Sequence, residues 1–295
     1  ARVSTSTVIL KGIRIRRAKA TITATDMSFI AHPFMIRALV TGVILAALLA
    51  SLGVFVTLRR MAFFSDGIAH ASLAGIAIAV LAGLAPLPVA LAWAVVVALL
   101  IWKLERDTRL PSDTVIGIFF TASMALGVVL MSFTNGYQPD LVSYLFGSIL
   151  AIRTADVAIT AILGAVIMVW LLSSFRQITY LSLAPESAAV SGIRASAHTI
   201  ALYIALAVAT VLGVKVLGIV LVSALLVLPP AASRMLSGSF KEFFAGSVIL
   251  AELMMLSGLV ISFAYDLPSG ATIVLVGSAV FALSAVVRAG AHKII

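Results

Sequence analysis

The feature that most constrains this chain is a series of apolar runs, each about as long as the hydrocarbon core of a bilayer is thick. A helix that crosses this core needs about 20 apolar residues, with roughly 17 to 25 tolerated. Boundaries placed at charged residues and at Pro or Gly give nine runs: 34–58, 66–84, 89–104, 114–133, 155–174, 197–212, 218–232, 243–264 and 271–287. The third, sixth and seventh runs are short. We therefore expect an all-α, polytopic membrane protein with about eight to nine transmembrane helices.

The composition agrees with this fold class. Of 295 residues, 62% are hydrophobic and 11% are charged, and the mean hydropathy is +1.21. A soluble domain of this length is about half apolar and a quarter charged. We predict one integral domain over residues 34–295. The chain has no cysteine, so any metal chemistry must use His, Asp, Glu, Met or backbone oxygen.

Two segments fall outside the predicted spans. Residues 1–33 are polar and basic and show no secretory signal. We interpret them as an added tail, which need not be native, with a natural start at Met27 and a short strand or weakly amphipathic element at 7–23. Residues 141–152 are apolar but too short to cross, which suggests an interfacial or re-entrant helix.

Lys and Arg in short loops predict the orientation of the spans. If the 58–65 loop is cytoplasmic and the spans alternate, only Arg37, Arg153 and Lys215 of the body lie outside. Eleven basic residues then lie inside: Arg59, Arg60, Lys103, Arg106, Arg109, Arg176, Arg194, Arg234, Lys241, Arg288 and Lys293. This orientation places the C-terminus in the cytoplasm. We attribute the formal charge of +9 to topology and predict membrane lipids, but no nucleic acid, among the partners.

The second run carries an acid and an imidazole. Asp66 and His70 are four residues apart and share one face of a helix, while Gly67, Ala71 and Gly75 form an adjacent stripe of small residues. Small stripes let a neighbouring helix approach closely. An acid and a His one turn apart can both reach a divalent cation. The alternative is structural: Asp66 caps the helix and His70 makes a buried hydrogen bond.

The longest predicted cytoplasmic connection, residues 176–198, contains a short helix by its boundaries. Pro185 suits a first helical turn and Gly192 suits a helix end. Such a helix is typical of a docking element, and a plain amphipathic connector explains it equally well.

Two further features of the spans are open to both functional and structural explanations. Pro229 and Pro230 remove backbone donors and are expected to break or kink the seventh span, which makes them a candidate hinge. Glu252 is a second intramembrane acid, either on an ion pathway or structural. The chain lacks a GxxxxGK[ST] motif, so we predict that it is not itself an ATPase.

Four blocks in order resemble the membrane permease family of zinc, manganese and iron ABC importers. They are LRRMAFFSDGIAHASLAGIA at 58–77, YLFGSILAI at 144–152, LAPESAAVSGI at 183–193 and GIVLVSALLVLPPAAS at 218–233. The first block is most similar to the zinc-type members.

This resemblance implies a permease in a prokaryotic cytoplasmic membrane that imports a divalent ion by alternating access: zinc first, with manganese or iron also possible. It implies a second copy of the chain, two cytoplasmic ATPase subunits that bind the ATP, a solute-binding protein outside, and no permanently bound cofactor. Asp66 and His70 then become transient metal ligands near a gate. A coupling helix that contacts the ATPase carries over to Ala184, Pro185, Glu186, Ser187 and Gly192.

Three alternatives remain at this point. A permease for iron-siderophore or cobalamin-type cargo needs a wide neutral pathway, which the Asp/His pair disfavours. A secondary metal carrier works without ATP and has no use for a docking helix. A structural scaffold leaves Asp66 and His70 unexplained.

Overall fold

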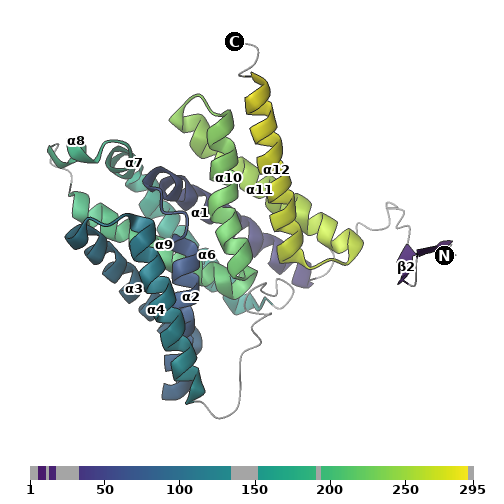
Figure 1. Ribbon diagram of the computed structural model, residues 1–295, viewed down its shortest axis with the longest axis horizontal. Coiled ribbons are helices and arrows are strands. Elements are labelled where there is room, and N and C mark those ends of the chain that lie inside the picture. The colour runs from purple at the N-terminus through teal and green to yellow at the C-terminus, as the bar shows by residue number, and fades with distance from the viewer. Residues whose placement is uncertain (1–5, 11–12, 18–32, 134–151, 191–193, 292–295) are drawn as a thin grey trace.

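The computed structural model describes residues 6–10, 13–17, 33–133, 152–190 and 194–291 (Figure 1). The helices are α1 Pro33–Arg59, α2 Phe64–Ala82, α3 Pro86–Thr108, α4 Ser112–Ser132, α6 Thr154–Ser173, α7 Phe175–Leu183, α8 Pro185–Val190, α9 Ala195–Leu217, α10 Ile219–Leu236, α11 Phe240–Tyr265 and α12 Ser269–Ala291. Strands β1 Ser6–Leu10 and β2 Ile13–Arg17 pair antiparallel, with Val8 opposite Ile15. The predicted helix at 141–152, except for Ile152, and most of the tail lie outside the described residues.

The all-α membrane fold is confirmed. Across the described ranges, nine helices are long and apolar enough to cross a membrane. The three runs that looked short form full-length spans, α3, α9 and α10. Boundaries placed at charges ended these helices too early, because backbone hydrogen bonding continues past a charge. In α3, for example, Lys103, Glu105 and Arg106 occupy the last turns.

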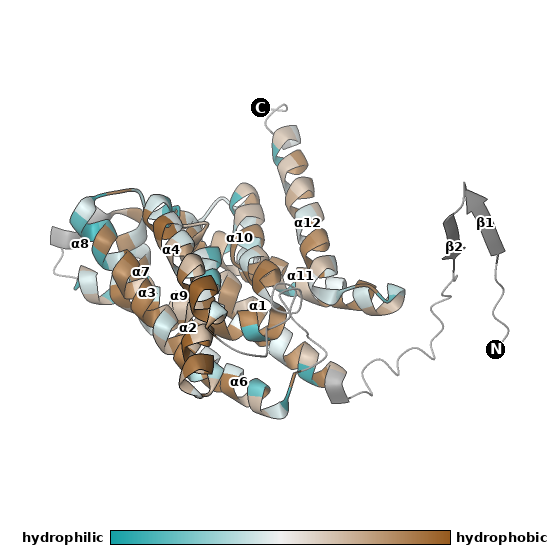
Figure 2. Cartoon of the chain, turned by 60° about the horizontal axis from the view of Figure 1, so that its bottom comes forward, coloured by the Kyte–Doolittle hydropathy of each residue, from teal (hydrophilic) through white to brown (hydrophobic). Residues whose placement is uncertain are grey.

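The spans differ in how deeply the chain buries them. In the most apolar stretch of each helix, 72% of α1 and of α9 is buried, whereas only 22% of α4 and of α6 is buried. The helices α1 and α9 therefore form the middle of the bundle (Figure 1). Large apolar side chains are exposed on the outer helices, such as Val128 (64%), Val169 (67%) and Leu275 (70%). Figure 2 shows hydrophobic residues along α2 and α3, as membrane-spanning helices require.

The proline pair does not break α10. The helix continues through Pro229 and Pro230 to Leu236, so the expected break is wrong. Pro230 has no N–H to donate to the carbonyl of Leu226 one turn earlier. A Cβ added to Gly53 of α1 would lie 2.0 Å from that carbonyl oxygen and 3.0 Å from the Pro230 ring. Because Gly53 has no side chain, α1 packs directly against this irregular turn, and the close packing holds α10 in helical form.

The small residues of α2 lie against two different helices. A Cβ on Gly67 would be 2.7 Å from Ile116 of α4. A Cβ on Gly75 would be 2.9 Å from Ala90 and from Trp93 of α3. Ala71, between the two glycines, is completely buried. The helix α2 is therefore packed closely between α3 and α4, and this packing fixes how its first turns face α4.

Candidate functional site

His70 has one ring nitrogen fixed by its own helix. Its Nδ1 lies 2.9 Å from the backbone oxygen of Asp66. A carbonyl oxygen can only accept, so Nδ1 carries the hydrogen, and in the neutral ring Nε2 keeps its lone pair. The Phe120 ring of α4 packs edge-to-face against the imidazole, with centroids 4.7 Å apart. The imidazole is thus oriented with a metal-binding nitrogen unused by that bond.

The Asp66 side chain bonds to another helix and does not cap its own. Helix α2 has Phe63 at its N-cap position, with no side-chain capping bond. The Asp66 carboxylate accepts a hydrogen bond from the Ser223 hydroxyl of α10. Ser65 in turn donates to Ser223 at 3.1 Å. These hydroxyls join the first turn of α2 to the second turn of α10. The side chain of Asp66 does not cap α2.

Asp66 and His70 line one cavity of about 560 Å³ between α2, α4 and α10. Its other lining residues are Phe63, Gly67, Asp113, Ile116, Gly117, Phe120, Ile219, Val220 and Ser223. A Cβ on Gly117 would meet nothing within 4 Å, so the α4 wall is open at that point. The cavity contains two carboxylates and one imidazole in a largely apolar surround.

Asp113 is the residue that sequence reasoning missed. It lies in the first turn of α4, and its buried Oδ1 has no hydrogen-bond partner among the described residues. In the sequence it appeared to be a loop acid just before the fourth apolar run. An acid at the very start of a span, like Asp66 in the second run, was the signal available. Even so, no group of three His, Asp or Glu side chains in the described ranges is close enough to hold one metal ion.

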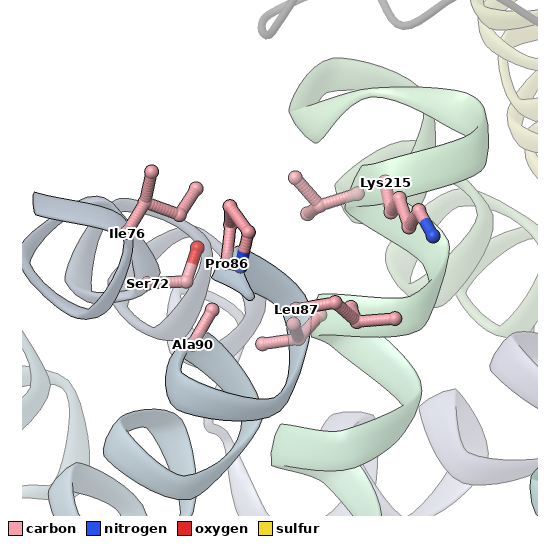
Figure 3. A pocket seen from close by; sticks show the side chains of 8 residues that line it. Ser72, Ile76, Pro86, Leu87, Ala90 and Lys215 are labelled. Carbon is pink, nitrogen blue, oxygen red and sulfur yellow. The ribbon is translucent and has the colours of Figure 1, made fainter. Parts of the chain in front are cut away.

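A second cavity, of about 210 Å³, lies between α2, α3 and α9 and has a different character. Figure 3 shows Ser72 and Ile76 of α2 facing Pro86, Leu87 and Ala90 of α3. Its one charged lining residue, Lys215 of α9, turns its amine away from these side chains (Figure 3) and lies 2.5 Å from Asp156. Without a carboxylate or imidazole in its lining, this cavity offers a metal ion no ligand of the predicted kind.

The predicted docking segment is longer and more helical than expected. Helix α8 covers Pro185–Val190, and α7, which was not predicted, precedes it over Phe175–Leu183. Glu186 and Ser187 are exposed, whereas Ala188 is buried. Backbone bonds Ala184 to Tyr180 and Ala188 to Ala184 join the two helices. Gly192 lies outside the described residues.

Glu252 and the proline pair are not part of the Asp66 cavity. Glu252 lies on α11, partly buried, and its Oε2 has no described partner. Pro229 and Pro230 are buried in α10, one to two turns beyond Ser223. The structure therefore brings Asp66 and His70 together with Asp113 and Ser223, and does not bring Glu252 or the prolines to them.

Comparisons with known proteins find similar membrane transport proteins. ZnuB, a high-affinity zinc uptake system membrane protein of Haemophilus influenzae, is 30% identical over 247 residues, which are 84% of this chain and 95% of that protein. MntC, a manganese transport system membrane protein of Halalkalibacterium halodurans, is 31% identical over 255 residues, 86% of this chain and 87% of that protein. The structure of PsaBC from Streptococcus pneumoniae in complex with Fab matches with a TM-score of 0.76 at 27% identity, covering 88% of this chain and 93% of that one.

The model of the ABC 3 transport family matches residues 31–288. This range covers every transmembrane helix from α1 to α11 and nearly all of α12. By sequence, and with a fold that matches a solved relative over nearly its full length, the chain belongs to the ABC 3 transport family.

Proposed function

We propose that this chain is the membrane permease of an ATP-driven importer that carries a divalent transition metal ion into the cytoplasm. The observation that carries the proposal is the cavity that Asp66 and His70 of α2 line together with Asp113 of α4. Ionisable residues within membrane spans are costly and usually functional. Carboxylate and imidazole together suit divalent transition metals.

The side chains of this cavity suit brief rather than lasting metal binding. Asp66 and His70 supply one oxygen ligand and one nitrogen ligand from adjacent turns. The Ser223 hydroxyl, which also lines the cavity, donates to the Asp66 carboxylate, as partners of metal ligands commonly do. Asp113 adds negative charge on the opposite wall. Because the three side chains do not form a complete coordination shell in the described structure, an ion keeps some of its water and leaves readily.

Alternating access, in which the permease opens first to one side of the membrane and then to the other, requires energy from other subunits. We propose a homodimer of this chain with two cytoplasmic ATPase subunits, which bind the ATP, and an extracytoplasmic metal-binding protein that delivers the ion. The exposed Glu186 and Ser187 of α8 would contact the ATPase. The charge distribution supports a cytoplasmic position for α8 and for the C-terminus. Two relatives of nearly equal similarity have names that refer to different metals, zinc and manganese.

Reconstitution tests this function against its alternatives. The chain is purified with a candidate ATPase subunit, placed in vesicles, and supplied with zinc, manganese or iron(II) on the binding protein. We expect ion uptake that depends on ATP hydrolysis and is lost without the ATPase. Equal uptake without ATP supports a secondary carrier instead. Uptake of a ferric siderophore or cobalamin, with no uptake of free ions, supports the chelate permease.

A further inference from the structure

A group of polar side chains joins α1, α7 and α9, and none of its members lines the candidate cavity. Arg59, the last residue of α1, donates from Nε to Ser182 of α7 at 3.2 Å and from Nη2 to Thr199 of α9 at 3.4 Å. The guanidinium is within electrostatic range of Glu105 and Tyr203, but it forms no salt bridge in the part of the chain that is described. Arg59 therefore connects the end of α1 to α7 and to α9, through one neutral hydroxyl on each.

Glu105 of α3 is the second centre of this group. One carboxylate oxygen accepts from the Tyr203 hydroxyl of α9, and the other accepts from Ser112 of α4 at 2.6 Å. Tyr203 is only 1% exposed. Its ring packs edge-to-face on Phe64, with centroids 5.3 Å apart, and its hydroxyl lies 3.6 Å from the sulfur of Met61. Each oxygen of this partly buried carboxylate thus accepts a hydrogen bond, one from the first residue of α4 and one from within α9.

Two hydrogen-bond or ring partners of Glu105 and Tyr203 lie close in sequence to the acids of the candidate cavity. Phe64 and Ser112 are the first residues of α2 and α4. Asp66 follows two residues after Phe64, and Asp113 directly follows Ser112. Ser182 lies near the end of α7, next to the proposed coupling helix α8. Apolar side chains would pack these helices together without the desolvation cost of partly burying an arginine and a glutamate, so packing alone does not account for the charged residues.

We propose that Arg59, Glu105 and Tyr203 are positioning residues that transmit movement of α7 and α8 to the first turns of α2 and α4. Hydrogen bonds are short and directional, so α7 cannot shift without moving Arg59 or breaking its bonds. A shift at Glu105 or Tyr203 changes how the first turn of α2, with Asp66, is placed relative to the first turn of α4, with Asp113. This proposal rests on the proposed function, because the movement originates in the ATPase subunits.

The ratio of metal ions taken up to ATP hydrolysed, measured in vesicles containing the full complex, tests the proposal. Tyr203→Phe removes one hydroxyl and keeps the ring against Phe64, and Glu105→Gln removes the charge at nearly constant shape. We expect each variant to lower the ratio about two- to 30-fold, the range found along coupling networks, while the ATPase still co-purifies and hydrolyses ATP. Arg59→Met should lower it further than Arg59→Lys, which keeps the charge. The double variant Tyr203→Phe with Glu105→Gln should be non-additive.

A purely structural role would change stability without changing the ratio. Asp156→Asn is the matched control, because it breaks the Lys215 salt bridge, which lies at the opposite end of α9 from Thr199 and Tyr203. We expect its ratio to stay at the wild-type value even if its melting temperature falls. Wild-type ratios in Tyr203→Phe and Glu105→Gln overturn the positioning proposal and leave the importer intact. Wild-type vesicles without ATP-driven uptake overturn the importer itself.

Discussion

The Asp66 carboxylate accepts a hydrogen bond from Ser223, a residue 157 positions later in the chain. This bond joins the first turn of α2 to the second turn of α10 beside the cavity that His70 and Asp113 also line. It makes the orientation of the proposed ion ligand depend on how α2 and α10 are arranged. A movement of α10 relative to α2 would therefore reorient the Asp66 carboxylate or break its hydrogen bond to Ser223.

Ser223→Ala should weaken metal binding without damaging the fold, because it removes one hydroxyl, which donates to the Asp66 carboxylate and accepts from Ser65. Loss of a partner behind a metal ligand typically lowers affinity about 10- to 100-fold. We expect KM for the ion to rise by about tenfold, measured as initial uptake in vesicles at wild-type abundance. Ser278→Ala, which removes a hydroxyl bonded only within α12, is the control. An unchanged KM in Ser223→Ala would show that this bond does not orient the ligand.

His70→Ala should abolish or strongly reduce metal uptake while membrane insertion and assembly survive. The reason is loss of the only imidazole among the residues that line the cavity. His198→Ala is the matched control, because His198 makes the same kind of Nδ1 bond to a backbone oxygen, that of Arg194, and does not line the cavity. Normal uptake in His70→Ala would assign this histidine a structural role.

Asp113→Asn should reduce uptake although its shape is nearly that of the wild-type side chain. The substitution removes one of two carboxylates from the cavity wall. We expect kcat/KM for the ion to fall about tenfold, a cost of about 1.4 kcal/mol at 25 °C, with an unchanged melting temperature. Asp107→Asn, at an exposed position near the end of α3, should have no effect. Equal uptake by both variants would remove Asp113 from the pathway.

Gly75→Leu should disrupt the contact between α2 and α3. Even the first added carbon would lie 2.9 Å from Ala90 and Trp93, and overpacking costs about 1–3 kcal/mol or more. We expect a lower melting temperature and less assembled protein on size-exclusion chromatography in detergent. Gly290→Leu meets no atom within 4 Å of its Cβ and should behave as wild type. A normal melting temperature for Gly75→Leu would mean that α3 can yield at this contact.

Glu186→Lys tests the proposed ATPase contact. It reverses one exposed charge on α8 and leaves the nine described spans unchanged. We expect less ATPase to co-purify, or hydrolysis that no longer responds to the loaded binding protein. A stronger version replaces residues 185–192 with a Gly/Ser segment of equal length. Undiminished metal flux without ATP in that protein would exclude the importer.

The sequence by itself determined the class of fold and the two site residues that α2 contributes. Nine apolar runs require helices, and the family resemblance drawn from four sequence blocks is confirmed by the ABC 3 match. Asp66 and His70 could be placed on one face because both belong to a single helix, whose periodicity is local. The ends of α3, α9 and α10 could not be placed accurately, since charges at a membrane surface do not stop a helix.

Only the tertiary structure decided which residues meet across helices. Asp113 and Ser223 reach the Asp66 cavity from α4 and α10, and Glu105 meets Tyr203 from α3 and α9. It also decided that Pro229 and Pro230 stay within α10, because Gly53 of α1 leaves room for the carbonyl of Leu226. Hydropathy is a property of each segment, so it predicts that a helix lies in the membrane. It carries no information on which face of that helix meets which neighbour, because that choice depends on side-chain shape at contacts far apart in the chain.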